Sequence, residues 1–285
     1  MRIRHTALPK ARLLLWLVCC GLLAACASPE PPLATAPLQS PNDRFGYRLV
    51  TLDNGLQALL ISNPDTPKAA ASLDVAAGSG DNPPDRGGLA HFLEHMLFLG
   101  TAKYPDPAEY ERFITEHGGS RNAYTSFEHT NYFFDVDAEH LAGALDRFAQ
   151  FFVAPNFDTA YVERERNAVE AEYQMGLKSD GRRGLDVLQA SMNPAHPFSR
   201  FAVGSLDSLA DRPGDPVRED LLAFYDEHYS ASLMRLVVLG SESLDELEGM
   251  VAKMFRDVPQ RDVRRSPILE PLFLPARLPM LLRVE

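Results

Sequence analysis

Cysteine and tryptophan are scarce in this sequence of 285 residues. The few that occur all lie close to the N-terminus: Trp16, Cys19, Cys20 and Cys26. A disulfide framework is therefore excluded for the rest of the chain. Hydrophobic residues make up 45% of the sequence, which is enough for a buried core to hold the fold together instead.

Basic residues are fewer than acidic ones. The first 25 residues contain four bases and no acid, and removing these four from the total of 28 leaves 24 basic and 39 acidic residues, a formal charge of −15. Binding to the phosphate backbone requires clustered positive charge, so this composition argues against nucleic acid as a partner. Peptide substrates are compatible with it.

The apolar run Leu13–Ala25 has only 13 residues, whereas a membrane-spanning helix needs about 20. Because a basic segment precedes it, we expect residues 1–25 to be a signal peptide. The run ends in Leu-Ala-Ala-Cys, which resembles a bacterial lipobox, in which the signal is cut before a cysteine, here Cys26, that is then lipidated. The alternative is an ordinary secretory signal cut near Ala27. Both predict export.

Residues 26–41 are expected to be the lipidated cysteine and a tether. Residues 27–41 contain five prolines and almost no charge, so they cannot bury enough apolar surface to fold. The prediction is an exported, periplasm-facing protein held at a membrane through Cys26. Ala27 follows the cysteine where an aspartate would favour the inner membrane, so we favour the outer one.

The rest of the sequence mixes strand and helix patterns without strict alternation. Strands are expected at residues 47–52, 56–62, 69–76, 121–126, 130–136 and 233–239, and helices at 88–99, 107–117, 141–152, 158–176, 217–228 and 243–255. This order predicts an α+β domain with helices packed on one face of a mostly antiparallel sheet. We assign residues 42–260 to this domain, and the proline-rich residues 261–285 to a linker and the start of a second, truncated domain.

The helix expected at 88–99 carries a pattern typical of a metal site. His91 and His95 are one turn apart, so their imidazoles can reach one ion about 2 Å from each. Glu94 is offset around the helix and can reach a water bound to that ion, as in the H-x-x-E-H pattern. The alternative is a solvated patch of two histidines and a glutamate. It is disfavoured because the neighbouring residues are apolar nearly all round, and burying unpaired polar groups is costly.

A catalytic zinc takes three protein ligands and keeps a fourth position for water. The best source of the third ligand is the acidic segment YVERERNAVEAEYQMG, in which Glu165 and Glu172 are two helical turns apart. Spacing alone does not choose between these two residues and Glu170. The same segment could also be an ordinary solvated helix face.

Several segments resemble the insulinase/pitrilysin family of zinc metallopeptidases, whose motif is HxxEH. They are HFLEHMLFLGTAKYP, GGSRNAYTSFEHTNYFFDV, ALDRFAQFF, ERNAVEAEY, NPAHPFSRFAVGS and YSASLMRLVVLG. The resemblance extends from about residue 45 to residue 255, and it is stronger to the long single-chain members than to the mitochondrial processing peptidases. It identifies the chain as the N-terminal portion of such an enzyme.

The resemblance implies a role for each residue of the site. His91, His95 and Glu172 match the ligands of one Zn²⁺ per chain. Glu94 matches the general base that activates a zinc-bound water. Glu165 matches a carboxylate on the same helix as Glu172 that supports the metal site without binding the metal itself.

The resemblance also implies that a peptide substrate adds as a strand beside Asn122 and Ala123. The expected activity is hydrolysis of peptides or small unfolded proteins by a zinc metalloendopeptidase. Family members build their chamber from two halves, so a second half is expected either in the same longer chain or as a separate subunit. We favour a fragment of a longer enzyme that is inactive by itself. The alternative is a non-catalytic or partner-dependent subunit of a two-part peptidase.

Overall fold

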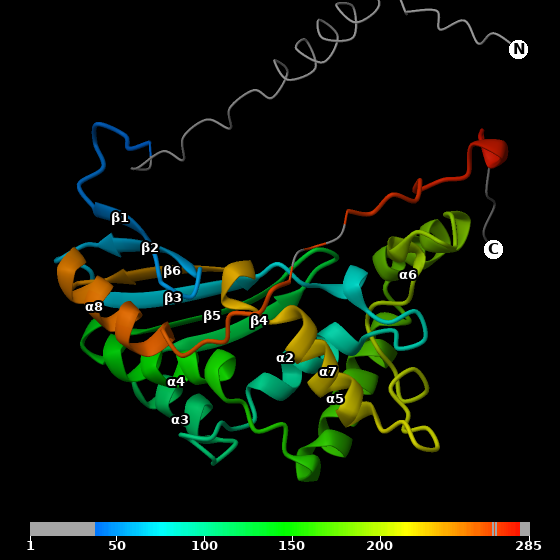
Figure 1. Ribbon diagram of the computed structural model, residues 1–285, viewed down its shortest axis with the longest axis horizontal. Helices are drawn as coiled ribbons and strands as arrows, with labels where there is room; N and C mark the ends of the chain where they lie inside the picture. The colour runs from blue at the N-terminus through cyan, green and yellow to red at the C-terminus, as the bar shows by residue number, and fades with distance from the viewer. Residues whose placement is uncertain (1–37, 264, 266, 280–285) are drawn as a thin grey trace, which may run out of the picture. The chain divides into compact units, whose positions relative to one another are not determined.

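The computed structural model of the protein describes residues 38–263, 265 and 267–279 (Figure 1). The predicted signal peptide, the lipidated Cys26 and most of the tether lie outside these residues and stay predictions. Among the helices that are described, none combines the length and the hydrophobicity needed to cross a membrane.

A single six-stranded sheet, in the order β1-β2-β6-β3-β5-β4, forms the centre of the described part. Its strands are β1 (Gly46–Thr51), β2 (Gln57–Ser62), β3 (Lys68–Val75), β4 (Ser120–Thr125), β5 (Thr130–Asp137) and β6 (Met234–Gly240). All neighbouring strands are antiparallel except β2 and β6. The hairpin between β1 and β2 turns at Gly55, whose φ of 85° is one that glycine adopts readily.

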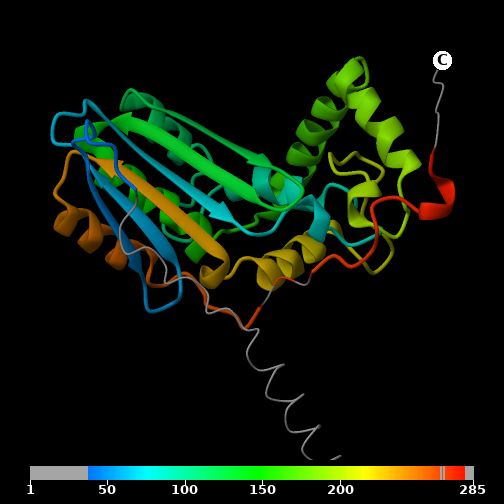
Figure 2. The same ribbon diagram turned by 90° about the horizontal axis from the view of Figure 1, so that it is seen from above.

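The helices pack against one face of this sheet and beyond one end of it. They are α2 (Leu89–Leu97), α3 (Glu109–Glu116), α4 (Leu141–Val153), α5 (Thr159–Gly176), α6 (Asp180–Ser191), α7 (Val217–His228) and α8 (Leu244–Phe255). Helices α4 and α8 lie under the sheet, with α3 beside α4 (Figure 1). Helix α2 packs against β4, α5 and α7, and the green helices α5 and α6 project beyond the end of the sheet (Figure 2).

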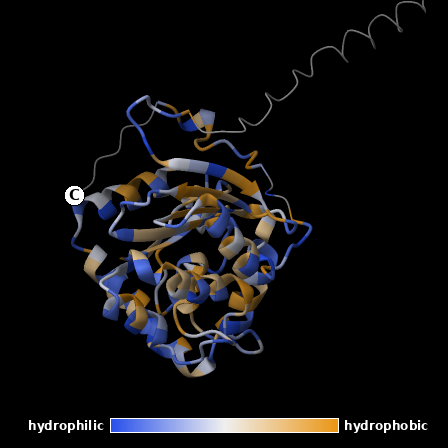
Figure 3. Ribbon diagram, turned by 90° about the vertical axis from the view of Figure 1, so that its left-hand side faces the viewer, coloured by the Kyte–Doolittle hydropathy of each residue, from blue (hydrophilic) through white to orange (hydrophobic). Residues whose placement is uncertain are grey.

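The core lies between the sheet and the helices. Alternate residues of each strand point into it, as the two-residue period of a strand requires; on β3 they are Ala69, Ala71, Leu73 and Val75, none more than 3% exposed. A cluster of aromatic side chains from β5 and α4 fills the centre: Tyr132, Phe134, Phe148, Phe151 and Phe152. Hydrophilic and hydrophobic residues alternate along the helices (Figure 3).

The predicted α+β class with a mostly antiparallel sheet is confirmed. Helix α6 has no counterpart among the expected helices. Of its 12 residues only Ser191 is buried, and Leu185 and Leu188 are each 44% exposed, so the helix has no apolar stripe packed into the core. The domain boundaries at residues 42, 260 and 261 stay predictions, and the last residues of the expected second domain, 280–285, lie outside the described residues.

Candidate metal and catalytic site

Helix α2 presents both histidines of the motif on one side. Its first turn is capped by Asn82, whose Oδ1 accepts a hydrogen bond from the Ala90 amide at 2.8 Å. Its apolar residues are buried: Leu89, Ala90, Phe92, Leu93, Met96 and Leu97. His91 and His95 are left on the stripe that faces α5, each with a side chain 17% exposed.

The structure brings His91, His95 and Glu172 together. The Nε2 atom of each histidine lies 3.5 Å from an oxygen of Glu172, His91 from Oε2 and His95 from Oε1. One ligand atom from each of the three residues lies within 4.8 Å of the other two. These three side chains could therefore hold a metal ion.

The acidic segment of α5 places its other carboxylates elsewhere. Glu165 Oε2 lies 3.4 Å from Nδ1 of His95, on the side of the ring away from Glu172. Glu170 accepts hydrogen bonds from the Leu206 amide at 2.8 Å and from Gln174 at 2.6 Å. Of the three glutamates that spacing leaves open, Glu172 is thus the one whose oxygens approach both histidines.

Hydrogen bonds at the far side of each ring determine the histidine tautomers. Nδ1 of His91 lies 2.7 Å from the carbonyl oxygen of Val203, and a carbonyl can only accept, so this nitrogen carries the proton. Nδ1 of His95 faces the Glu165 carboxylate and donates in the same way. Both Nε2 lone pairs are then free and directed toward Glu172, which is the arrangement that a metal ligand requires.

The donor set fits zinc. Zinc bonds to histidine nitrogen and carboxylate oxygen are about 2.0–2.2 Å long, and tetrahedral ligands at that distance lie about 3.4 Å apart. Each nitrogen–oxygen separation of 3.5 Å, one to each oxygen of Glu172, is close to this length, and one ligand atom from each residue lies within 4.8 Å of the other two. Two neutral imidazoles and one carboxylate would also leave the ion a net charge of about +1, which suits catalysis of hydrolysis.

Glu94 lies beside this cluster and is 7% exposed. Burial raises the pKa of its carboxyl, and the hydrogen bond from Thr125 and the nearby histidines only partly offset this effect. The Thr125 hydroxyl donates to Glu94 Oε2 at 2.6 Å and so holds the carboxylate in place. A carboxylate with a raised pKa is a stronger base, which is what proton transfer from water needs.

The electrostatics of the ligands favour a carboxylate that is charged. Protonated His91 would donate from Nε2 to Glu172, and this contact lowers the pKa of Glu172 despite partial burial. For Glu165, burial raises the pKa, but His95 and Arg164 outweigh burial and leave it below the ordinary value. For His91, burial opposes protonation, yet Glu172 and the Val203 carbonyl outweigh burial and raise the pKa. A metal cation that took the place of the proton on His91 would be attracted by the same Glu172 carboxylate.

A cleft of about 580 Å³ opens above the cluster. One wall is strand β4, which contributes Arg121, Asn122, Ala123, Tyr124 and Thr125. β4 is the last strand in the sheet order of the described residues, so one edge of it faces the cleft region rather than another described strand. Asn122 and Ala123, the predicted substrate-binding residues, therefore lie at the edge of the sheet next to the candidate metal site.

Sequence reasoning missed two groups of the site. The Val203 carbonyl belongs to the main chain, so no residue type marks it. Thr125 lies within the strand predicted at residues 121–126, but a threonine in a strand is common and indicates no role. Its bond to Glu94 depends on the packing of α2 against β4, which the sequence pattern does not specify.

The family model described as Insulinase (Peptidase family M16) matches residues 57–199, half of the chain. The chain belongs to this family. The matched range includes every predicted site residue, from His91 on α2 to Glu172 on α5. A second M16 model, described as the Peptidase M16 inactive domain, matches residues 216–279. Strand β6 lies in this second range and pairs with β2 and β3, so the two matched ranges share one sheet.

Relatives within M16 extend far beyond this chain. The human insulin-degrading enzyme is 51% identical over 228 residues, which are 79% of this chain and 22% of the human protein. Protease 3 of Salmonella typhimurium is 38% identical over 246 residues, 86% of this chain and 26% of the relative. The crystal structure of pitrilysin matches with a TM-score of 0.83 and 39% identity, covering 87% of this chain and 26% of that one. The chain thus spans about a quarter of the length of these relatives, and the expected membership of the insulinase/pitrilysin family is confirmed.

Proposed function

We propose that the protein is a zinc metalloendopeptidase that hydrolyses peptides or small unfolded proteins. The observation that carries this proposal is the convergence of His91, His95 and Glu172 on one point, with the buried Glu94 beside it. Three ligands that leave one position open, together with a general base, are the parts that zinc-dependent hydrolysis requires. Membership of an insulinase peptidase family supports the same reading.

The residues of the chain divide the work between them. Zinc, when bound, supplies a Lewis acid that polarises the scissile carbonyl and makes water more acidic. Glu94 takes a proton from the attacking water and passes it to the leaving amine. Thr125 keeps Glu94 directed at the reacting atoms, and Glu165 keeps His95 protonated on Nδ1.

The substrate peptide is proposed to bind as an added strand along β4. The Ala123 amide donates a hydrogen bond to Oδ1 of Asn122 at 2.9 Å. A carbonyl of the bound peptide would replace this side-chain acceptor. Main-chain hydrogen bonds at a sheet edge form with the backbone of a peptide whatever its sequence, so they suit an extended or unfolded substrate. A folded protein would have to expose such a segment first.

A second peptidase half is proposed to complete the catalyst, in the same longer chain or as a separate subunit. The support is that relatives are more than three times as long as this chain and that one matched model describes an inactive M16 domain. We propose in addition that the protein is exported and faces the periplasm, with a lipid on Cys26 anchoring it, and we favour the outer over the inner membrane. The N-terminal sequence alone supports this location.

Metal analysis and peptide cleavage by the full-length gene product test the proposal. We expect about one zinc per chain, lost in His91→Ala and Glu172→Ala. Glu94→Gln should keep its zinc and lose turnover by a factor of about 10² to 10⁴, because only proton transfer is removed. Full activity of Glu94→Gln would remove Glu94 from the mechanism. Unchanged zinc in Glu172→Ala would make Glu165 or Glu170 the better candidate for the third ligand.

The second candidate is a non-catalytic or partner-dependent subunit. The greater length of the matched relatives supports this candidate, because the chain supplies the metal site and only one wall of a cleft. Residues 26–285 alone should then bind zinc and cleave peptides poorly, and cleavage should return when the second half is added. Full turnover by residues 26–285 alone would contradict the need for a second half.

A further inference from the structure

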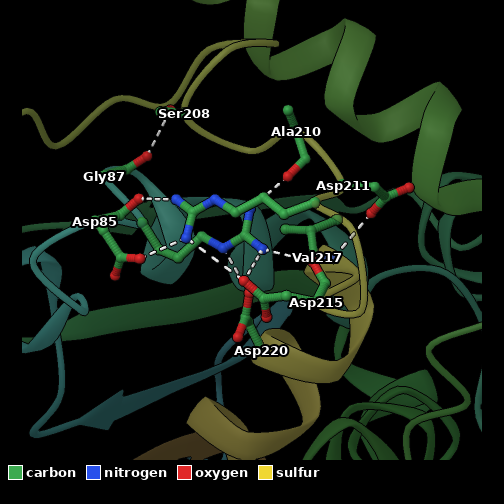
Figure 4. Close-up of polar contacts among 10 residues, drawn as sticks. Asp85, Gly87, Ser208, Ala210, Asp211, Asp215, Val217 and Asp220 are labelled. Atoms are coloured by element: carbon green, nitrogen blue, oxygen red, sulfur yellow. Dashed lines mark hydrogen bonds and ion pairs between the residues drawn. The ribbon is translucent and has the colours of Figure 1, made fainter.

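Arg86 is a buried arginine three residues before the first residue of α2. It is 1% exposed. Its guanidinium donates to the main-chain carbonyls of Ala210 at 2.5 Å and Asp215 at 2.8 Å, and it forms ion pairs with the side chains of Asp215 at 3.0 Å and Asp220 at 2.5 Å (Figure 4). A charge buried to this extent has one stable position, since moving it would leave donors and carboxylates without partners.

The residues on either side of Arg86 are tied to the same part of the chain. Arg212 pairs with the side chain of Asp85 and donates to its carbonyl. The Ser208 hydroxyl donates to the Gly87 carbonyl at 2.7 Å (Figure 4). Three consecutive residues, 85–87, are therefore fastened to the segment that follows α6.

This segment in turn contacts both helices of the candidate metal site. The Val203 carbonyl accepts from Nδ1 of His91 on α2. The Leu206 amide donates to Glu170 at 2.8 Å, and the Leu206 carbonyl accepts from Arg166 at 3.2 Å, both on α5. Residues 203–208 thus bridge the helix with the histidines and the helix with Glu172.

Residues 203–208 have no helix or strand of their own to hold them. Between Ser199 and Val217 the chain is turns and bends, so the direction of the Val203 carbonyl depends on side-chain contacts to neighbouring elements. Arg86 is the most deeply buried charged residue among those that make these contacts. It also binds two main-chain carbonyls, which fixes backbone and not merely a side chain.

We propose that Arg86 is a positioning residue for the metal site. It holds residues 203–217 against the start of α2, so that the Val203 carbonyl keeps His91 protonated on Nδ1 and directs Nε2 at Glu172. The inference rests on the proposed function, because a metal is what makes the His91 tautomer matter. A role confined to stability is the competing explanation, and the two differ in what happens to His91.

The test compares Arg86→Met with Arg147→Met. Arg147 is a matched control, since its guanidinium forms three bonds of 2.7–3.0 Å to Glu109 between α3 and α4 and is 17% exposed. Zinc affinity is measured by chelator competition, and the His91 tautomer by ¹⁵N NMR of the metal-free protein. We expect Arg86→Met to weaken zinc binding at least about tenfold and to populate the Nε2-protonated tautomer. Arg147→Met should lower the melting temperature and change neither reading.

Ser208→Ala is the second variant, in case Arg86→Met does not fold. It removes the hydrogen bond to the Gly87 carbonyl and the one that the Ser208 hydroxyl accepts from the Ser205 amide at 3.0 Å, without leaving a buried charge, and about a threefold loss of zinc affinity is expected. Folded variants that keep the zinc affinity and the His91 tautomer of the unaltered protein would overturn the inference. If the unaltered protein itself binds no zinc, the proposed function fails, while the tautomer comparison still decides the role of Arg86.

Discussion

Glu165 Oε2 lies 3.4 Å from Nδ1 of His95, although the two residues are 70 positions apart in the sequence. The carboxylate is on the side of the imidazole away from Glu172, and its side chain is only 13% exposed. Glu165 therefore contacts a ligand and not the position where an ion would bind. Its effect must pass through the orientation and basicity of His95.

Glu165→Ala should weaken zinc binding by about 10- to 100-fold, because His95 loses the acceptor that fixes its tautomer. Glu165→Gln should cost less, since the amide oxygen can still accept. Glu163→Ala is the control: the side chain of Glu163 is 69% exposed and pairs with Arg166 on the same helix. Chelator competition provides the affinities. Equal affinities for the Glu165 and Glu163 variants would show that His95 needs no partner.

Thr125→Val should keep zinc and lower turnover about tenfold. The variant has the same shape as threonine but lacks the hydroxyl that donates to Glu94 at 2.6 Å, and a hydrogen bond to a charged group contributes about 1.5–3 kcal/mol. That bond also lowers the pKa of Glu94 against the effect of burial. Without it the pKa rises further, so Glu94 ionises at higher pH.

The pH profile of kcat/KM for Thr125→Val should accordingly move its acidic limb to higher pH, because the base must be ionised to accept a proton. Thr125→Ser retains a hydroxyl and should behave like the unaltered protein. A uniform loss of activity with no displacement of the acidic limb would mean that Thr125 acts on the substrate or the fold and not through Glu94.

Much of the fold can be predicted from the sequence because local signals agree with the packing. Asn54-Gly55 produces the β1–β2 turn, Ser243 caps α8 with Glu246 in a capping box, and strand periodicity identifies the buried face of β3. Helix α6 is the counterexample. It is stabilised by its cap at Ser179 and by contacts with neighbouring segments, and neither produces an apolar stripe.

The metal site divides in the same way. His91 and His95 follow from helix geometry, because one helix carries both. Glu172 comes from another helix, and its register against His91 depends on tertiary contacts such as those of residues 203–208. Spacing therefore leaves three glutamates open; the family resemblance selects Glu172, and the packed structure shows that Glu172 faces both rings. Arg86 is hidden for a similar reason, since its partners lie more than 120 residues away.

Asp146→Asn should destabilise the protein at neutral pH and not at low pH. Partial burial raises the pKa of Asp146, but hydrogen bonds from Lys103 at 2.6–2.7 Å and from the Tyr104 hydroxyl outweigh burial and leave the pKa below its ordinary value. Stability from a depressed carboxylate is present above the unfolded pKa of about 3.9 and is lost as the pH falls through the folded pKa.

Urea unfolding of Asp146→Asn at a series of pH values measures this difference. We expect a cost of about 1 kcal/mol at pH 7, discounted because Lys103 is half exposed, and a cost that shrinks toward zero below about pH 4. Asp257→Asn, which removes a pair that is exposed on both sides, should change little at any pH. A cost for Asp146→Asn that stays constant across the series would assign its role to shape and not to charge.

Gly88→Ala should be among the most damaging single-methyl changes in the chain. Gly88 has a φ of 90°, which residues other than glycine rarely adopt, and a Cβ there would overlap the backbone of Gly204. Gly214→Ala separates the two effects, because its φ is 76° but its Cβ would meet no described atom within 4 Å. Gly214→Ala should cost about 1 kcal/mol of folding stability for the backbone alone, and Gly88→Ala roughly 1–3 kcal/mol more for the overlap.

Since Gly204 adjoins Val203, Gly88→Ala should also weaken zinc binding, whereas Gly214→Ala should not. Thermal unfolding and chelator competition measure the two quantities. Similar losses for both variants would show that the close approach of residues 88 and 204 has no consequence for the site.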